Sequence, residues 1–481
     1  MITPDLKTFR SLAPQGTHVP LALELLADLE TPVSALLKLT RGFKEQRCFL
    51  FESVEGGERV GRYSYLGSGG FEALATRDSD PLPKLKARMA GYKPVQVPGL
   101  PPFWGGAVGY LGYDAVRHME PVASHNPDPL GFPESLHFLA DAVVAFDHVK
   151  HGMTLTCLAD ARDKRPAALG RAYARAERRL KGMLRLLQGP LPKLPRPRAG
   201  KPQPWSCNVD KPAYLKWVAR GMEYIKAGDI FQIQVGRRLS KRTVVHPFSI
   251  YRELRGLNPS PYMFYLQDGQ RELIGASPEI LVTLQGETVC IRPIAGTRRR
   301  GRDEEHDLAM ERELKADPKE RAEHIMLVDL ARNDVGRVCR PGTVKVGELM
   351  VIERYSHVLH LVSDVKGRLN PGLDAFDVLK ASFPAGTVTG SPKIRSMQII
   401  DELENIKRGP YGGSVGLIGF NGDLMEALTI RTLMMDGQTV HAQASAGIVA
   451  DSQPELEYLE TENKLKGSMA AVERAEGRGR P

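Results

Sequence analysis

The sequence predicts an α+β protein in which antiparallel sheets carry helices on their outer faces. Runs that alternate between apolar and polar residues are typical of strands, and capped helical segments stand between them. The chain has 481 residues, 42% of them hydrophobic and 26% charged, which is enough for two or three ordinary domains or one large one. We therefore expect a globular protein whose helices and sheets pack in layers.

The N-terminal part supplies mainly strands and then one long helix. The runs "LHFLADAVVAFDH" and "MTLTCLA" alternate as strands do. A helix rich in Ala, Leu and Arg is predicted over residues 163–188, followed by the Pro-rich basic segment "GPLPKLPRPRAGKPQPW". We therefore expect an N-terminal region of residues 1–188, a linker at 189–206 and a second region at 207–475.

Helices and hairpins alternate after this segment. Asp210 and Pro212 open a helix that Gly228 closes, and "DIFQIQVGRRLS" then switches to the two-residue period of a strand. The stretch "IGASPEILVTLQGETVCIRPIAGT" is predicted to form a hairpin that turns at Gln285 and Gly286. These elements indicate sheets covered by helices.

Composition argues against several classes of protein. The formal charge of +9 comes without the long Lys/Arg blocks of a nucleic-acid-binding arm, so it suits a small anionic ligand. The five cysteines form no C-x-x-C pair, which argues against a zinc site or a disulfide framework and favours a reducing cytoplasm. The start lacks the apolar stretch of a secretion signal, and "FWGGAVGYLGY" is too short and too rich in glycine to span a bilayer.

Two acidic helices are the first candidates for chemistry. Glu320 and Glu323 lie one turn apart in "KERAEHIMLVDLARNDVGRV", and Glu457, Glu460 and Lys464 share a face in "DSQPELEYLETENKLKG". Taken alone, each set is more often a solvated charged face than a site. Two such pairs in a chain without soft ligands indicate Mg²⁺, because this ion prefers oxygen and takes only one or two protein carboxylates.

The same two helices carry predictions about local structure. Ser452 and Glu455 resemble a capping box at the start of the second helix. In the first helix, the period places Ile325, Leu327, Val328 and Leu330 in the buried stripe.

Three further segments leave alternatives open. "FPAGTVTGSPKIRSMQII" fails the spacing of a phosphate-binding loop, and its glycines serve either an anion at a helix start or a tight turn. "YSHVLHLVSDV" alternates as a strand and places His357 and His360 on opposite faces, where a lone histidine is usually a core residue. "RPIAGTRRRGR" is a solvated basic turn or a nucleic-acid patch, and the lack of interleaved aromatic residues weakens the second reading.

Together, these motifs resemble the chorismate-utilising enzymes, most closely the anthranilate synthase component I family. The matching segments run in family order from residue 49 to 464. They are "LFESVEGGERVGRYSYLG", "GGAVGYLGYD", "GDIFQIQVGRR", "NPSPYMFY", "GASPE", "RPIAGTRRRG", "AEHIMLVDLARNDVGRV", "YSHVLHLVSDV", "FPAGTVTGSPK", "RGPYGGSVGLIGFNGD", "IRT" and "AQASAGIVADSQPELEYLETENK".

The resemblance implies a fold and an activity. The fold is a layered α/β sandwich in which the N-terminal region packs closely on the chorismate-binding region, so that residues 189–206 need not separate independent units. The activity is a Mg²⁺-dependent lyase reaction, the first committed step of tryptophan biosynthesis. Chorismate is aminated at ring C2 with loss of the 4-hydroxyl, and pyruvate is then eliminated to give anthranilate. The alternatives are aminodeoxychorismate synthase component I and a non-catalytic protein that binds an anion or tryptophan.

The resemblance also assigns site residues. The expected metal ligands are Glu323 and Glu460, with Glu320 and Glu457 in support through waters. The expected catalytic residues are His360, Thr387 and Gln232. His360 is expected to assist departure of the hydroxyl as a general acid, and Thr387 to contact the same oxygen. The expected substrate-binding residues are Tyr411, Arg431, Gly447 and Lys464.

Some positions separate related activities within the family. Gln232 stands where isochorismate and salicylate synthases carry a lysine, and Ala295 stands where many aminodeoxychorismate synthases carry one. Neither water activation nor covalent amination is therefore expected. Ser445 replaces a frequent glycine, a change that we expect to be tolerated.

The resemblance further implies regulation and a partner. The expected tryptophan site comprises Glu52, Ser53, Pro261, Tyr262 and Met263, with the Glu52 carboxylate and the Ser53 hydroxyl holding the ammonium of tryptophan. Phe51 and Val60 replace residues that are commonly Leu and Trp in the family. No G-x-C-x-G motif is present, so ammonia is expected from a separate glutamine amidotransferase chain, component II, in an assembly of two copies of each chain.

Overall fold

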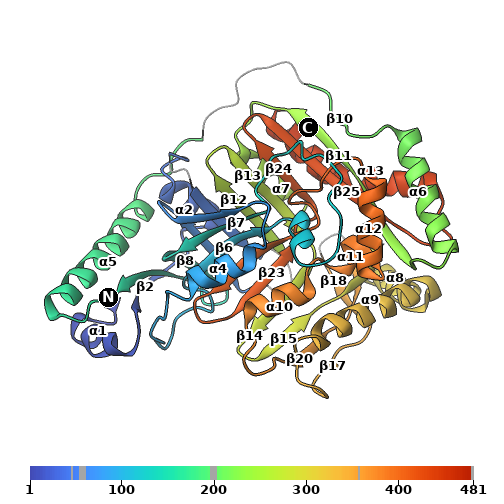
Figure 1. Ribbon diagram of the computed structural model, residues 1–481. Coiled ribbons are helices and arrows are strands. Elements are labelled where there is room, and N and C mark those ends of the chain that lie inside the picture. The colour runs from blue at the N-terminus through green and yellow to red at the C-terminus, as the bar shows by residue number, and fades with distance from the viewer. Residues whose placement is uncertain (45–46, 54–60, 195–202, 356–357, 478–481) are drawn as a thin grey trace.

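Two large antiparallel sheets lie face to face and carry helices on their outer faces (Figure 1). This computed structural model describes residues 1–44, 47–53, 61–194, 203–355 and 358–477. The arrangement confirms the predicted α+β class with layered antiparallel sheets.

The larger sheet contains thirteen of the described strands, and each is antiparallel to its neighbours. Its order is β1-β2-β9-β8-β4-β3-β12-β13-β24-β25-β11-β10, and β21 also pairs with β11. The strands are β1 (Ile2–Thr3), β2 (His18–Leu26), β3 (Arg47–Glu52), β4 (Tyr63–Ser68), β8 (Ala142–Asp147), β9 (Gly152–Asp160), β10 (Ser206–Cys207), β11 (Gln232–Arg242), β12 (Tyr262–Asp268), β13 (Arg271–Ser277), β21 (Gly390–Ser391), β24 (Thr432–Asp436) and β25 (Thr439–Ile448).

The second sheet has nine of the described strands in the order β17-β20-β15-β14-β23-β22-β6-β7-β5. They are β5 (Glu72–Thr76), β6 (Gly106–Leu111), β7 (Ser135–Ala140), β14 (Ile280–Gln285), β15 (Thr288–Ile291), β17 (Lys345–Val346), β20 (Val365–Arg368), β22 (Ser414–Gly419) and β23 (Leu424–Leu428). A small sheet has the order β16-β19-β18, with β16 (Ile294–Arg299), β18 (Val351–Arg354) and β19 (Val358–Val362).

The helices lie mainly on the outer faces of the two large sheets, and helices also pack against the small sheet. They are α1 (Leu6–Leu12), α2 (Pro32–Leu39), α4 (Pro81–Met89), α5 (Pro166–Leu187), α6 (Lys211–Lys226), α7 (Pro247–Leu257), α8 (Glu304–Ala316), α9 (Pro318–Gly336), α10 (Ala375–Ser382), α11 (Gly386–Thr389), α12 (Lys393–Leu403) and α13 (Pro454–Ala475), with short 3₁₀ turns at Ala13–Gln15 and Tyr113–His118. The helices predicted at 163–188 and after Asp210 are present as α5 and α6, and the Asp210 side chain caps α6 by accepting from the Ala213 N–H.

Four apolar layers hold the described parts of the chain together. The layer between the two large sheets is rich in aromatic residues, among them Phe49, Phe138 and Phe264. A second layer lies between the larger sheet and helices α2, α5, α7 and α13, and a third lies between the nine-stranded sheet and helices α4, α9 and α10. A fourth, smaller layer lies between strands β11 and β25 and helices α6 and α12. Burying each of these aromatic side chains contributes roughly 1.5–3 kcal/mol.

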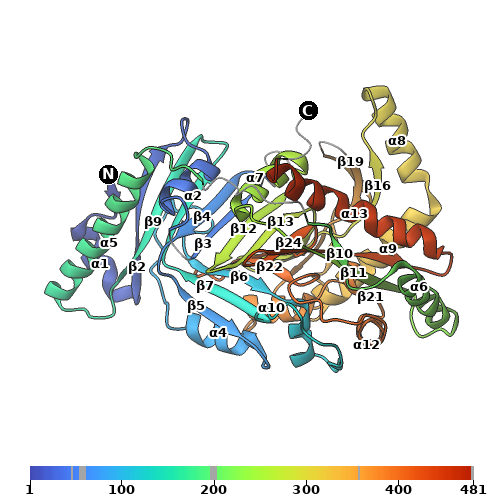
Figure 2. The ribbon, with the colours of Figure 1, turned by 90° about the horizontal axis from the view of Figure 1, so that it is seen from above.

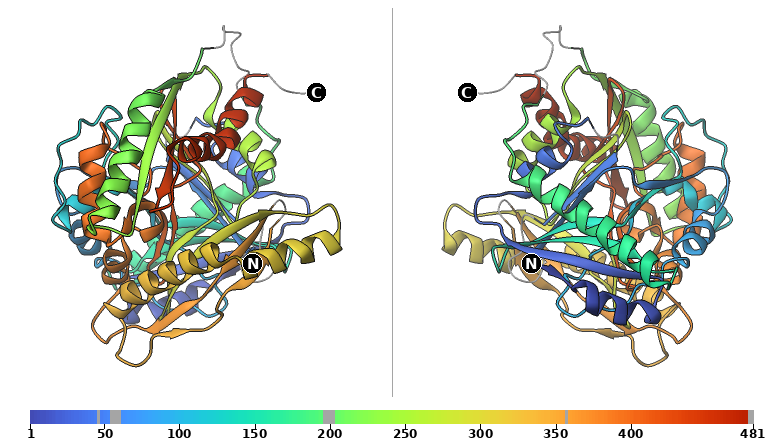
Figure 3. Two further views of the ribbon diagram at one scale, coloured as in Figure 1. Left: turned by 90° about the vertical axis from the view of Figure 1, so that its right-hand side faces the viewer. Right: turned by 90° about the vertical axis from the view of Figure 1, so that its left-hand side faces the viewer.

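The segments before and after residues 189–206 share both large sheets. Strand β3 pairs with β12 in the larger sheet, and β6 pairs with β22 in the other. Seen from above, α1 and α5 lie at one end of the molecule, and α6, α9 and α13 lie at the other (Figure 2). The left view of Figure 3 looks onto this second end, where α9 runs below α13.

Two local predictions were wrong. Helix α13 begins at Pro454 with Gln453 as an N-cap that makes no side-chain bond, and the Ser452 hydroxyl instead accepts from the Val449 N–H at 3.0 Å. In α9, Leu327 and Val328 are buried as predicted, but Leu330 is only half-buried and Ile325 is 43% exposed, because the buried stripe starts at His324. In the part of the chain that the structure describes, no helix is both long enough and apolar enough to cross a membrane.

Candidate active site

A cavity of about 500 Å³ lies where β11 and β25 approach helices α9 and α13. All eleven residues that were predicted to be catalytic, substrate-binding or metal-binding line it. They are Gln232, Glu320, Glu323, His360, Thr387, Tyr411, Arg431, Gly447, Glu457, Glu460 and Lys464.

The two acidic helices converge on this cavity from distant parts of the sequence. Glu320 and Glu323 come from α9, and Glu457 and Glu460 come from α13. Burial raises the pKa of Glu323, and the negative charges of Glu320 and Glu460 add to the effect. Burial likewise raises the pKa of Glu457, again with a contribution from Glu460. Four carboxylates thus share a region where their charges repel.

Two of the four carboxylates are ion-paired in this structure. Glu320 pairs with Arg298 at 3.1 Å, and Glu460 pairs with Lys464 at 2.5 Å, one turn along the same helix. Among the described residues, no three of the Asp, Glu, His and Cys side chains are close enough together to hold a metal ion by themselves. An all-oxygen set with repelling charges nevertheless fits Mg²⁺, since this ion takes one or two protein carboxylates and fills its shell with water and substrate oxygens.

His360 lies on β19 and faces the cavity. Its Nδ1 is 3.1 Å from the Gly296 carbonyl oxygen. Because a carbonyl oxygen can only accept, Nδ1 carries the proton and donates this hydrogen bond. In the neutral ring Nε2 is therefore the acceptor atom. Burial lowers the pKa of His360 and keeps the ring neutral near pH 7. The imidazole is therefore suited to accept a proton.

Glu279 is a site residue that the sequence reasoning missed. It follows β13, lines the cavity, and accepts a hydrogen bond of 2.9 Å from the Thr387 hydroxyl. Burial raises the pKa of Glu279 to about 7, although the bond from Thr387 and the charge of Lys464 oppose the rise. A carboxylic acid with this pKa can donate a proton near neutral pH. The sequence does contain one signal for Glu279, because it is the acidic residue at the end of the motif "GASPE".

Backbone carbonyl oxygens hold two of the cationic side chains that line the cavity. Arg431 is held in the left-handed region with φ of 52°, and its Nη1 donates to the Lys464 carbonyl at 3.0 Å. Lys464 Nζ donates to the Ser445 carbonyl at 2.9 Å. These bonds hold both cationic side chains at the cavity wall, where an anion needs charged partners to be buried.

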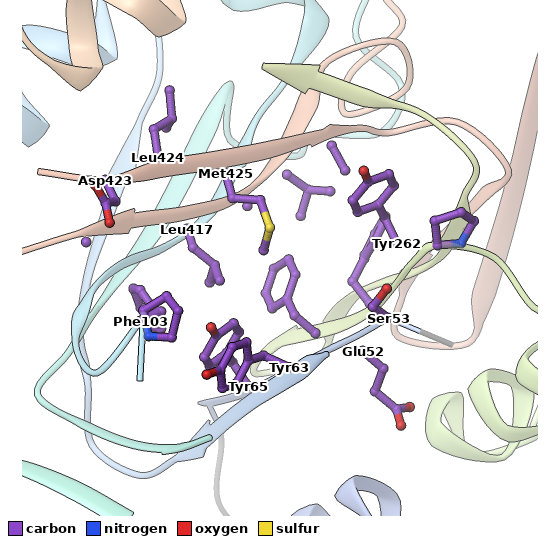
Figure 4. Close-up of a pocket in the computed structure, with 18 of the residues that line it drawn as sticks. Glu52, Ser53, Tyr63, Tyr65, Phe103, Tyr262, Leu417, Asp423, Leu424 and Met425 are labelled. Carbon is purple, nitrogen blue, oxygen red and sulfur yellow. The ribbon is translucent and has the colours of Figure 1, made fainter. Parts of the chain in front are cut away.

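A second cavity, of about 280 Å³, contains all five residues predicted for the tryptophan site (Figure 4). These residues are Glu52, Ser53, Pro261, Tyr262 and Met263. Phe51 also lines this cavity, whereas Val60 lies outside the described residues.

The Glu52 carboxylate is directed away from the second cavity, in contrast to its expected role (Figure 4). It accepts from the Tyr251 hydroxyl at 2.5 Å and pairs with Arg255 at 3.1 Å. The Ser53 hydroxyl, by contrast, is buried and has no hydrogen-bond partner among the described residues. Ser53 is therefore the better candidate for a polar contact with a ligand.

This combination of fold and site is that of a chorismate binding enzyme. Residues 46–470 match the family of that description, and the chain belongs to it. A curated relative named anthranilate synthase component 1 from Thermus thermophilus is 47% identical over 95% of this chain and 98% of the relative. A second relative of the same name, from Aquifex aeolicus, is 45% identical over 98% of both chains.

Solved structures agree with this assignment. Anthranilate synthase component I from Streptococcus pneumoniae superposes with a TM-score of 0.76 at 35% identity, covering 86% of this chain and 95% of that one. The menaquinone-specific isochorismate synthase from Escherichia coli superposes with a TM-score of 0.72 at 18% identity, covering 97% and 98% of the two chains. The second likeness shows the fold alone.

Proposed function

We propose that this chain is the aminating component of an anthranilate synthase, which converts chorismate and ammonia to anthranilate and pyruvate. The observation that carries the proposal is one cavity that combines the four carboxylates of α9 and α13, a hydrogen-bonded Glu279–Thr387 pair, and the cations Lys319, Arg431 and Lys464. Relatives with the corresponding name are 45–47% identical over nearly the whole chain. The proposal includes a cytoplasmic location, which the five scattered cysteines favour.

The charges of the cavity suit chorismate. This substrate carries two carboxylates, and each needs a charged partner when it leaves water. Arg431 and Lys464 supply two cations at one wall. Tyr411 and the backbone at Gly447 complete the pocket.

Mg²⁺ is part of the proposal. We assign Glu323 and Glu460 as its ligands, with Glu320 and Glu457 in support through waters. When bound, the ion would hold a substrate carboxylate and neutralise the carboxylates around it. The raised pKa of Glu323 supports the assignment. Repulsion from neighbouring carboxylates contributes to this pKa, and a bound cation would remove that repulsion and stabilise the charged form of Glu323.

Proton transfers are assigned to Glu279 and His360. As the bond from ammonia nitrogen to ring C2 forms, the bond from C4 to the hydroxyl breaks, and the oxygen needs a proton to leave as water. Glu279 can donate that proton, and Thr387 orients its carboxyl group. We assign neutral His360 not to departure of the hydroxyl, as first expected, but to the second step. There it can accept the C2 proton as the bond from C3 to the enol oxygen breaks, and the enolpyruvate that leaves becomes pyruvate by taking up a proton at its methylene carbon. Gln232 lies beside Glu323 at 3.4 Å and brings no activated nucleophile.

The source of ammonia and the control of activity complete the proposal. We infer a separate glutamine amidotransferase chain, component II, in an assembly with two copies of each chain. We also infer that tryptophan binds in the second cavity and inhibits the enzyme. Residues 1–188 would then contribute one wall of this effector cavity, residues 207–475 would hold the whole active site, and 189–206 would connect them.

A product assay tests the activity. With Mg²⁺ and a high ammonium concentration, the chain alone should convert chorismate to fluorescent anthranilate, and glutamine should support the reaction only after component II is added. Formation of isochorismate or 4-amino-4-deoxychorismate would contradict the assignment. A non-catalytic anion-binding or tryptophan-binding protein would form no product, and Glu323→Gln would then have no activity to remove.

A further inference from the structure

A hydrogen-bonded chain of three side chains runs along the wall of the active-site cavity. The Tyr411 hydroxyl donates to Ser445 Oγ at 2.9 Å, and Ser445 Oγ donates to Gln234 Oε1 at 3.0 Å. All three residues line the cavity. None of the assigned roles uses Gln234 or the Ser445 hydroxyl.

The direction of this chain follows from its first member. Burial raises the pKa of Tyr411, so the phenol keeps its proton and acts as the donor. Ser445 therefore directs its own proton to an acceptor, which is the carbonyl oxygen of the Gln234 amide and not its NH₂ group. The hydroxyl of Ser445 thus selects one of the two orientations of the Gln234 amide.

This orientation places the NH₂ group of Gln234 beside Gly447. A Cβ atom at Gly447 would come within 2.8 Å of Gln234 Nε2, so a side chain at position 447 would displace the amide. Within the described parts of the chain, Nε2 has no hydrogen-bond acceptor. Two N–H donors are therefore available at the wall to which Gly447 belongs.

The backbone of Gln234 is held from the opposite side. Arg408 Nη2 donates to the Gln234 carbonyl at 2.8 Å, and Arg408 is paired with Glu404 at 2.5 Å. Both side chains of this pair are at most 3% exposed. Because the backbone of Gln234 is fixed, the freedom that remains is rotation of its side chain, and the bond from Ser445 restricts this rotation.

The same wall carries positive charge. Lys464 Nζ donates to the Ser445 carbonyl at 2.9 Å, and Arg431 Nη1 donates to the Lys464 carbonyl. Donors from Gln234 next to these cations would meet an anionic oxygen of a bound molecule, because charge-assisted hydrogen bonds are stronger than neutral ones.

We propose that Gln234 is a further substrate-binding residue whose Nε2 donates to a carboxylate oxygen of the bound dianion, and that Ser445 is a positioning residue that orients this amide. The inference rests on the proposed function for the identity of the dianion. Ser445, which replaces a frequent glycine of the family, thereby acquires a specific role.

Steady-state kinetics with ammonium and saturating Mg²⁺ test the proposal. Ser445→Ala should raise the KM for chorismate about five- to tenfold with kcat within about twofold, as expected for one lost hydrogen bond. Gln234→Leu should raise the KM at least as much. The double variant should match Gln234→Leu alone, because Ser445 acts through Gln234. Ser445→Thr, which keeps the hydroxyl, should restore most of the affinity.

A matched control is available on the same pair of strands. Ser240 Oγ lies 2.7 Å from His441 Nδ1, on β11 and outside the cavity, and Ser240→Ala should leave the KM unchanged. An unchanged KM in Ser445→Ala, or a full additional loss in the double variant, would overturn the proposal. If no variant forms anthranilate, calorimetric titration of the same proteins with chorismate still decides it, because the predicted order of affinities does not require turnover.

Discussion

The Thr387 hydroxyl donates a hydrogen bond of 2.9 Å to the Glu279 carboxylate within the active-site cavity. Glu279 follows β13 and Thr387 lies in α11, so the contact joins segments more than a hundred residues apart. Burial favours the protonated acid and the bond from Thr387 favours the carboxylate, and the pKa that results is about 7. The Thr387 hydroxyl therefore helps to set the pH at which Glu279 can donate a proton.

Removing this hydroxyl should shift the pH dependence of the reaction. Thr387→Val keeps the shape of the side chain but removes the bond that stabilises the carboxylate, so the pKa of Glu279 rises above 7. If protonated Glu279 is the acid, the alkaline fall of kcat then moves to higher pH. The measurement is a kcat profile from pH 6 to 9. Thr389→Val is the control, because Thr389 bonds to the Ala385 carbonyl and not to Glu279.

Removing the acid itself should be more severe. Glu279→Gln keeps the size of the side chain and loses the transferable proton, and we expect kcat to fall about 10²–10⁴-fold, the usual contribution of a general acid. The KM for chorismate should change little. Rapid kinetics that follow anthranilate fluorescence measure both quantities, and a kcat close to that of the unaltered chain would exclude Glu279 as the proton donor.

Metal affinity should depend on the two acidic helices together. Glu323→Gln and Glu460→Gln should each raise the Mg²⁺ concentration needed for half-maximal rate by about 10–100-fold, because each removes one anionic ligand. Calorimetric titration with Mg²⁺ gives a readout that is independent of turnover. Glu455→Gln is the control, since Glu455 lies on α13 as well but is exposed and pairs with Lys211 at 2.6 Å. If all three variants show the same Mg²⁺ dependence, the metal does not bind to Glu323 and Glu460.

Much of this arrangement could be predicted from the sequence. Cap residues and periodicity located α6 and β11, and ordered motifs brought together eleven residues that line one cavity. The sharing of both sheets by the two halves of the chain could not be predicted, because strand pairing such as β3 with β12 depends on long-range contacts and not on local pattern. Motifs identify candidate site residues, but they do not show which of these residues are buried.

The residues that were missed illustrate this limit. Glu279 ends a short motif of the sequence, but the burial that raises its pKa, and the Thr387 and Lys464 contacts that oppose the rise, cannot be seen there. Glu52 was expected to face a ligand, yet Tyr251 and Arg255 from α7 bind its carboxylate. Both outcomes depend on neighbours that are distant in sequence.

Tryptophan inhibition should depend on Ser53 and Met263. Ser53→Ala removes a buried hydroxyl that has no partner among the described residues, so the loss should weaken tryptophan binding without harming the fold. Met263→Thr reduces the apolar surface of the same cavity. Inhibition curves and the rise in melting temperature with added tryptophan are the measurements. Unchanged inhibition in both variants would place the effector elsewhere.

A buried acid on β23 should make the stability of the protein depend on pH. Glu426 is fully buried, and within the described residues neither carboxylate oxygen makes a hydrogen bond of normal geometry. Burial raises its pKa from 4.5 to about 8, and a contact with the Ser414 hydroxyl opposes the rise only in part. The folded state therefore holds a proton that the unfolded state releases above pH 4.5. Stability is greatest below that pH and falls as the pH rises towards 8, by roughly 3–5 kcal/mol in total for this group.

Glu426→Gln should remove this dependence, because the amide has the same shape and does not titrate. The variant should gain stability relative to the unaltered chain as the pH rises from 5 to 8, and the two should converge near pH 4.5. Thermal unfolding midpoints across this range provide the measurement. Glu287→Gln is the control, since exposed Glu287 pairs with Arg368 at 2.7 Å and its pKa is lowered. Parallel curves for Glu426→Gln and the unaltered chain would mean that Glu426 is ionised in the folded protein, and that a partner for its charge must exist.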